Sequence, residues 1–99
     1  MHRLVLPPGA GHEQRSRRYG VIVQADQLLG LSTVIVAPTS TQALPASFRP
    51  VIEVDDQPTR VLVEQIRALD LTRLGEQVRM LSLDELRQVD DALELVLDL

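Results

Sequence analysis

The C-terminal segment of the chain carries the pattern that most narrows the choice of fold. It reads LSLDELRQVDDALELVLDL over residues 81–99. Ser82 is followed three positions later by Glu85, which is the spacing of a capping box at the start of a helix. The segment therefore predicts an amphipathic terminal helix whose acidic face is solvated. The apolar residues expected to share its other face are Leu86, Val89, Leu93 and Val96 or Leu97.

The rest of the chain favours short strands. Its apolar runs are rich in Val and Ile and end at Pro, Gly or polar residues, as strands do. Strands followed by one helix predict an α+β fold, built on a small twisted sheet or a partly closed barrel. Residues 25–30 suit one helical turn, 55–58 a turn, and 70–75 a turn or short helix. The predicted strands are residues 3–6, 19–24, 32–38, 49–54, 59–69 and 76–81.

Composition limits the chain to one small domain with an aliphatic core. Its 99 residues suit a single domain, and Tyr19 and Phe48 are its only aromatic side chains. The lack of cysteine excludes disulfides and thiolate metal sites. The apolar run at the N-terminus is too short for a signal peptide, and no run is long enough to span a membrane. We therefore expect a cytoplasmic protein without a membrane segment.

Charge is unevenly distributed along the chain. The formal net charge is −4, yet residues 1–49 hold five arginines against two acids, a net of +3. Residues 50–99 hold five arginines against twelve acids, a net of −7. Because a partner meets the local charge rather than the total, the N-terminal half remains compatible with an anionic partner.

Most catalytic and cofactor motifs are missing from the sequence. It has no glycine-rich phosphate loop and no dinucleotide fingerprint. His2 and His12 lie in different segments, and neither has a second nitrogen ligand at a useful spacing. The sequence therefore predicts no metal site and no other cofactor.

Two polar loops remain as candidates for chemistry. One contains the arginines of residues 15–18, and the other is the Thr-Ser-Thr run of residues 39–41. Arginine holds phosphate oxygens with a two-pronged fork and hydroxyls add hydrogen bonds, so together the loops suit a phosphodiester. Taken separately, the arginines are more typical of a solvated surface and the hydroxyls of an ordinary turn.

The string GHEQRSRRYGVIV, residues 11–23, is more telling than the composition. It resembles the segment of MazF/PemK (Kid-like) toxins in which Gly-x-Glu precedes an Arg, a Pro and an apolar strand. The matching residues here are Gly11, Glu13 and Arg18, with Tyr19 in place of the Pro. The resemblance continues in VIVAPTS, residues 34–40, which looks like the family's third strand running into its Thr-Ser pair.

Later segments match the family in the same order. Residues 47–54 look like the next strand, and residues 61–74 resemble the strand with an Asp-Gln-x-[Arg/Lys] motif, with Glu64 in place of the Asp. The terminal helix also has a counterpart. The family's first strand carries a Gly-[Glu/Asp]-hydrophobic-Trp motif that is not found here. We therefore expect residues 1–99 to form a single toxin-like domain whose first strand is truncated or missing.

This resemblance implies a function. Members of the family are toxins of type II toxin–antitoxin systems and act as metal-independent endoribonucleases on single-stranded RNA, cutting at short sequences by attack of the 2′-OH. They are homodimers on an SH3-like barrel, the CcdB/Kid-like toxin fold. An antitoxin silences them by laying an acidic tail in the RNA groove.

The resemblance also assigns roles to residues. Arg18 would stabilise the charged transition state, Thr39 would donate to a phosphate oxygen, and Glu13 would act as the base or orient Arg18. His12 is an alternative base because it titrates in the right range. Arg67 would face RNA or instead pair with an acid in the sheet, and Phe48 is expected in the core. The residues expected to bind RNA are Arg15, Arg17, Ser40, Thr41, Arg49, Gln65 and Arg67.

Two other functions remain open from the sequence. The first is a toxin-fold module that binds a protein, as in the gyrase-poisoning CcdB branch; the Arg18 and Thr39 pair argues against it. The second is a catalytically inactive relative, which is consistent with the missing first strand. RNA cleavage mapping would distinguish these functions from a nuclease.

Overall fold

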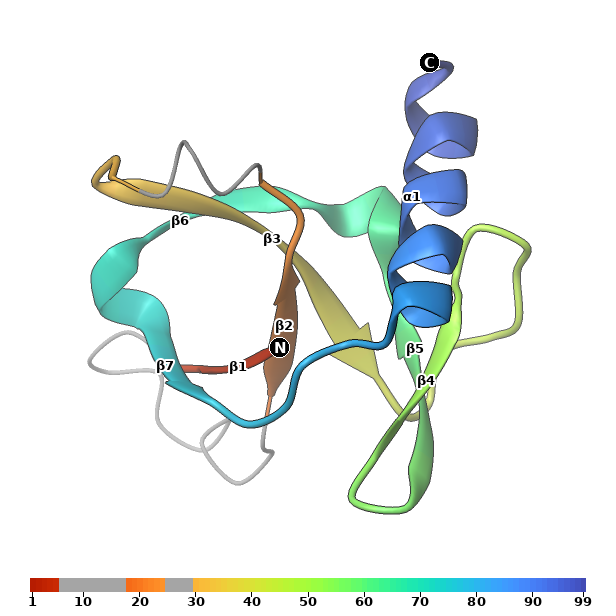
Figure 1. Cartoon of the computed structure of the whole chain (residues 1–99), viewed down its shortest axis with the longest axis horizontal. Helices are drawn as coiled ribbons and strands as arrows, with labels where there is room; N and C mark the ends of the chain where they lie inside the picture. Colours follow the sequence, from red (N-terminus) through yellow and green to blue (C-terminus); the bar gives the residue numbers. More distant parts are fainter. Residues whose placement is uncertain (6–17, 25–29) are drawn as a thin grey trace.

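The chain folds as one antiparallel sheet with a helix at its C-terminus (Figure 1). The computed structural model describes residues 1–5, 18–24 and 30–99. Two short 3-10 turns, η3 (Val63–Gln65) and η4 (Leu71–Arg73), connect strands, and the helix is α1 (Leu83–Leu97). The α+β prediction is therefore confirmed. The strands are β1 (His2–Leu4), β2 (Tyr19–Ile22), β3 (Thr33–Ser40), β4 (Val51–Val54), β5 (Gln57–Val61), β6 (Arg67–Asp70) and β7 (Leu74–Gln77).

Strand β3 organises the sheet because it changes partner along its length. The order is β4-β5-β3-β2-β1-β7, and β6 also pairs with β3. The first half of β3 pairs with β6, from Thr33 opposite Asp70 to Val36 opposite Arg67, and its end pairs with β5. Pro38 falls between these two pairings, and its carbonyl accepts from the backbone N–H of Leu62 at 2.8 Å. The missing N–H of the proline therefore coincides with the change of partner.

The predicted continuous strand over residues 59–69 is wrong. The structure divides it into β5, η3 and β6. Val61, Leu62 and Val63 are all buried, with at most 9 % of each exposed. Val61 and Val63 belong to the main core cluster, whereas Leu62 lies outside it, as alternation along a strand requires. The alternation ends at Val63, where the turn at η3 leads the chain from β5 to β6.

Other boundaries differ from the sequence-based expectation by smaller amounts. The last strand lies at Leu74–Gln77, where it pairs with β1, rather than at residues 76–81. The short helix expected within residues 70–75 is present as η4. The turn expected over residues 55–58 joins β4 to β5. The helical turn proposed for 25–30 lies almost entirely outside the described residues.

The terminal helix begins at the predicted capping box. The hydroxyl of Ser82 accepts from the backbone N–H of Glu85 at 3.2 Å, and the Glu85 carboxylate accepts from the backbone N–H of Ser82 at 2.8 Å. Glu85 also bonds the guanidinium of Arg79 at 2.7 Å, which ties the helix to the preceding segment. No helix in the described part of the chain is long and apolar enough to cross a membrane.

The main core lies between this helix and the sheet. Val89 and Ala92 of α1 are 3 % exposed and belong to one cluster with Ile52 of β4 and Val61 of β5. Phe48 packs against the cluster, as expected from the sequence. Leu86, expected on the buried face, is 41 % exposed. A second, smaller cluster is formed by Val34 and Val36 of β3 with Leu69 of the neighbouring strand β6. Burial of aliphatic side chains therefore holds α1 beside the β4–β5 hairpin (Figure 1).

Candidate functional site

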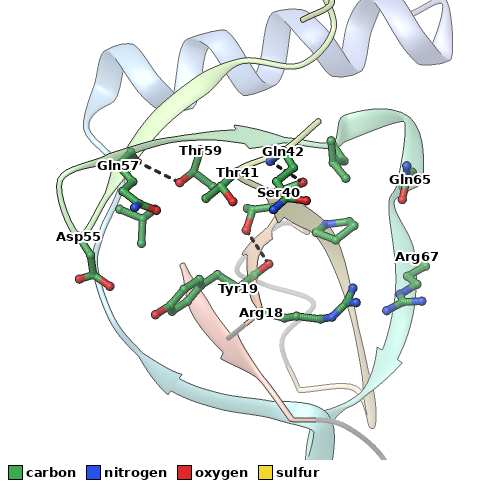
Figure 2. A pocket seen from close by; sticks show the side chains of 14 residues that line it. Arg18, Tyr19, Ser40, Thr41, Gln42, Asp55, Gln57, Thr59, Gln65 and Arg67 are labelled. Atoms are coloured by element: carbon green, nitrogen blue, oxygen red, sulfur yellow. Dashed lines mark hydrogen bonds between the residues drawn. The ribbon is translucent and has the colours of Figure 1, made fainter. Parts of the chain in front are cut away.

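A polar pocket of about 640 Å³ lies where β2, β3 and the β4–β5 hairpin meet the segment from η3 to β6. It contains residues from distant parts of the chain, and Figure 2 shows their side chains turned toward a shared space. Its lining residues are Arg18, Tyr19, Pro38, Thr39, Ser40, Thr41, Gln42, Val54, Asp55, Gln57, Thr59, Leu62, Gln65 and Arg67.

Hydroxyl groups form the middle of the pocket. Thr39 is at the end of β3, and its hydroxyl donates to the backbone carbonyl of Tyr19 on β2 at 3.1 Å. The hydroxyl of Ser40 accepts from the backbone N–H of Gln42 at 3.1 Å, which forms a tight turn at the strand end. Thr59 is 3 % exposed and donates to the carbonyl of Gln57 at 3.1 Å. These bonds fix the hydroxyls of Thr39 and Ser40 at the end of β3 and that of Thr59 within β5.

Arg18 and Arg67 supply positive charge at one end of the pocket. Arg18 precedes β2, and Arg67 begins β6 opposite Val36. Figure 2 shows both guanidinium groups on the same side of the pocket, pointing toward each other. Neither arginine forms an ion pair with any described residue. Two cations at one site are mutually unfavourable unless an anion joins them, so the geometry suits an anionic ligand.

Arg49, also expected to bind RNA, instead forms an ion pair within the fold. Arg49 holds Glu64 with its guanidinium, at 2.7 Å from Nη2 and 3.1 Å from Nε to the same carboxylate oxygen. It also donates to the carbonyl of Leu44 and lies over the Phe48 ring. The hydrogen bonds from Arg49 hold the pKa of the Glu64 carboxyl below its usual value. The Arg49–Glu64 pair therefore braces η3 from outside the pocket.

A second, smaller pocket of about 280 Å³ adjoins the first. Tyr19, Val54 and Asp55 line both. Its remaining wall includes Arg3, which forms a loose ion pair with Glu76 at 3.9 Å. The hollowed surface therefore continues from the main pocket, past Asp55, to residues of β1 and β7.

Metal ligands are not gathered in the described part of the chain. No group of three or more His, Asp or Glu side chains lies close enough there to hold a metal ion. His2, on β1, is partly buried, and burial lowers its pKa below the ordinary value. The pocket lining contains arginines, hydroxyls, amides and one carboxylate, a set suited to an oxyanion.

Comparison with known proteins agrees with this geometry. Residues 3–97 match the family model described as PemK-like, MazF-like toxin of type II toxin–antitoxin system. The chain belongs to this family. The toxin candidate Rv3098A of Mycobacterium tuberculosis is 45% identical over 83 residues, which cover 83% of this chain and 77% of that protein.

Solved structures of MazF-type proteins have the same fold. MazF from Deinococcus radiodurans has a TM-score of 0.76 at 26% identity, over 99% of this chain and 94% of that one. A mycobacterial endoribonuclease, solved in complex with its cognate antitoxin, has a TM-score of 0.80 at 17% identity. That match covers 99% of this chain and 90% of the other. The predicted resemblance to MazF/PemK toxins and the CcdB/Kid-like fold are therefore confirmed.

In this MazF-like chain the pocket unites most of the predicted site residues that the structure describes. Arg18 and Thr39, expected to be catalytic, both line it. The expected RNA-binding residues that line it are Ser40, Thr41, Gln65 and Arg67. Arg49 does not, because it is bound to Glu64. Four predicted or alternative site residues, Glu13, Arg15, Arg17 and His12, lie outside the described residues.

The β4–β5 hairpin adds residues to the pocket that the sequence alone does not indicate. Asp55, Gln57 and Thr59 all line the pocket. The sequence predicts a turn over residues 55–58 and a strand from Thr59, but the position of this hairpin over the end of β3 depends on pairing between β3 and β5, with Ser40 opposite Arg60. Local sequence carries no signal for that register, so these residues are found only from the folded chain.

Proposed function

We propose that this MazF-like chain is a toxin whose pocket binds and cleaves single-stranded RNA. The observation that supports this most directly is that Arg18, Arg67 and Thr39 line one pocket. The two guanidinium groups lie on the same side of it (Figure 2). Two arginines without ion pairs to described residues provide charge for a phosphodiester, and the strand-end hydroxyls provide neutral donors. Gln65, beside them, adds an amide donor for RNA.

The proposed reaction uses the nucleophile that RNA carries. The 2′-oxygen attacks the adjacent phosphorus, and the bond from phosphorus to the 5′-oxygen breaks. Glu13 takes the proton of the 2′-OH, and a water molecule donates a proton to the leaving 5′-oxygen, giving a 2′,3′-cyclic phosphate and a 5′-hydroxyl; the hydroxide left behind takes the proton from Glu13. Arg18 remains protonated and neutralises the charge that accumulates on the phosphoryl oxygens.

Thr39 has a proposed role that follows from its present hydrogen bond. Its proton is donated to the Tyr19 carbonyl. Rotation about its Cβ–Oγ1 bond would transfer that donation to a phosphoryl oxygen as negative charge develops there. One well-placed donor of this kind lowers a barrier by about 3 kcal/mol, roughly a hundredfold in rate.

The partners follow from the same proposal. A mycobacterial endoribonuclease of this fold was solved with its cognate antitoxin. We infer that an acidic antitoxin segment competes with RNA for the Arg18 and Arg67 end of the pocket. We also infer a homodimer, since a chain of this size with free sheet edges gains stability by burying more surface. Sedimentation at micromolar concentration should then show a dimer, and a monomer alone would contradict this inference.

A cleavage assay tests the proposed function. Purified protein should cut a mixed-sequence RNA into fragments with 2′,3′-cyclic phosphate ends, and excess EDTA should leave the rate unchanged because arginines supply the positive charge. The variant Arg18→Ala should be inactive. A protein that arrests growth without cutting RNA would instead act as a protein-binding toxin, and one that does neither would be an inactive relative.

A further inference from the structure

The pocket is chemically polarised along its length. Figure 2 shows Arg18 and Arg67 at one end and Asp55 at the other, with the hydroxyl-bearing side chains between them. Tyr19 and Asp55 are neighbours across that far end, since both line the main pocket and the smaller one beside it. A carboxylate only accepts hydrogen bonds and repels phosphate. The arginines of the adjoining pocket, Arg3 and Arg79, are each paired with a glutamate. The Asp55 end is therefore less suited to the RNA backbone than the opposite end, and it suits a group that donates hydrogen bonds.

Asp55 is available for such a contact. No hydrogen bond or ion pair to another described residue engages its carboxylate, and the residue is exposed. Gln57, two positions later, lines the same pocket with an amide that both donates and accepts. Tyr19 is partly buried against the main core and also lines the pocket at this end (Figure 2). Together these residues supply an acceptor, an amide and an aromatic surface.

The two aspartates of the β4–β5 turn differ in their relation to the pocket. Val54 pairs with Gln57, so Asp55 and Asp56 form a two-residue hairpin loop, with φ of 51° and 63°. Such loops favour Asn, Asp or Gly at the first position and Gly at the second, because these residues adopt positive φ at lower cost. Asp56 has nearly the same conformation but does not line the pocket. Asp55 and Asp56 therefore share a backbone conformation, and only Asp55 faces the pocket.

Resting on the RNA-cleaving function proposed above, we propose that Asp55 is a specificity-determining residue that binds a guanine base of the RNA. Its two carboxylate oxygens accept from N1–H and N2–H on the Watson–Crick edge, and the Gln57 amide donates to O6. The base stacks on Tyr19, the mode by which proteins commonly hold unpaired RNA bases. The phosphate is then held at the opposite end, by Arg18 and Arg67.

Guanine is the base that fits this acceptor best. Its Watson–Crick edge presents two adjacent donors, so it can bond both carboxylate oxygens at once. Adenine and cytosine present one amino group beside an acceptor nitrogen. Uracil presents one N–H between two carbonyls. Each of these three bases would direct an acceptor lone pair at the carboxylate, and that mismatch is the source of the discrimination.

Cleavage mapping on a long RNA of mixed sequence tests the proposal. The wild-type protein should cut at sites that share a guanine at one fixed position. Asp55→Asn should lose that preference by about tenfold to a hundredfold, because an amide replaces one acceptor by a donor. Asp56→Asn is the matched control, since it changes the same group in the same turn outside the pocket, and it should keep the wild-type sites.

A synthetic oligonucleotide isolates the contact. Inosine lacks the N2 amino group of guanine, so replacing the guanine by inosine should slow the wild-type protein but leave Asp55→Asn unaffected. If Asp55→Asn is too slow to assay, binding of 2′-deoxy substrates containing guanine or inosine gives the same comparison. Wild-type cleavage without a shared guanine, or a preference that survives in Asp55→Asn, would overturn the assignment of Asp55 alone. Absence of any cleavage or binding by the wild type would overturn the RNA function itself.

Discussion

The hydroxyl of Thr39 donates to the backbone carbonyl of Tyr19 at 3.1 Å, and this bond ties the end of β3 to the start of β2. Arg18 immediately precedes Tyr19 in the chain, so the bond also fixes the backbone from which the Arg18 side chain enters the pocket. The hydroxyl therefore has a structural partner in the free protein and, in the proposed reaction, a phosphoryl oxygen in the transition state.

This dual role predicts a clear difference between two variants of Thr39. Thr39→Ala removes the donor and should lower kcat about a hundredfold. Thr39→Ser keeps the donor and should retain most of the activity. Single-turnover cleavage of one RNA substrate measures both. Equal loss in the two variants would show that the methyl group, through packing, matters rather than the hydroxyl.

Arg18 is expected to be more important than Thr39 because it carries the charge. Arg18→Ala should abolish cleavage while leaving the protein folded, and Arg18→Lys should restore little, since a point charge does not reproduce a planar fork. Arg87 is exposed on α1, so Arg87→Ala is the matched control and should cleave normally. Circular dichroism establishes folding beside the cleavage assay. An Arg18→Ala protein that cuts at the wild-type rate would disprove the assignment of this pocket.

Salt dependence separates the pocket arginines from the net charge. RNA binding should weaken steeply with salt although the protein carries −4 overall, because phosphates meet arginines locally. Replacing Arg67 with Ala should reduce the slope of log affinity against log salt by about 0.7, the value for one phosphate contact on a single strand. Fluorescence anisotropy with a 2′-deoxy oligonucleotide measures the slope. An unchanged slope would mean that Arg67 does not contact phosphate.

The elements of this fold differ in how far the sequence predicts them. The helix after Ser82 is encoded by local bonds, so its capping box is visible as a spacing of letters and is present in the structure. The segment after Thr59 has alternating apolar residues that suit a strand, and the alternation holds as far as Val63, which packs in the main core with residues of α1. The turn at η3 places Val63 against that helix, and a local pattern does not contain this long-range contact.

The candidate site shows the same division. Arg18 and Thr39 lie in segments whose residue order resembles a known family, so the sequence indicated both. Asp55 and Gln57 join them only because β5 pairs with the end of β3. Arg49 appears in the sequence as one more cation, and only the folded chain reveals that Glu64 neutralises it.

The β4–β5 turn offers a test of backbone strain. Asp56 has φ of 63° and lies at the second position of a two-residue hairpin loop, where Gly is preferred. Asp56→Gly should therefore raise the free energy of unfolding by about 0.5 kcal/mol, as the relief of strain exceeds the added entropy of the unfolded chain. Urea denaturation measures it. Destabilisation by Asp56→Gly would indicate that the Asp56 carboxylate makes a contact in solution.

The Arg49–Glu64 pair predicts how stability depends on pH. The pKa of Glu64 is lowered in the folded protein, chiefly by hydrogen bonds from Arg49. Such a carboxylate stabilises the fold above its ordinary pKa of 4.5, and the contribution is lost as the pH falls through the lower folded-state value. Glu64→Gln should therefore lower the free energy of unfolding by about 1 kcal/mol at pH 7. In strong acid, the free energies of unfolding of Glu64→Gln and the wild type should become equal.

Urea denaturation at pH 7 and at about pH 3 provides the measurement for this last prediction. Glu94→Gln, which changes an exposed carboxylate on α1, is the control and should be neutral at both values. Because Arg49 lies outside the pocket lining, Glu64→Gln should also retain cleavage at pH 7. A stability difference that grows on acidification would contradict the ion pair. If Glu64→Gln left stability at pH 7 unchanged and weakened RNA binding, the Arg49–Glu64 pair would instead be part of the RNA-binding surface.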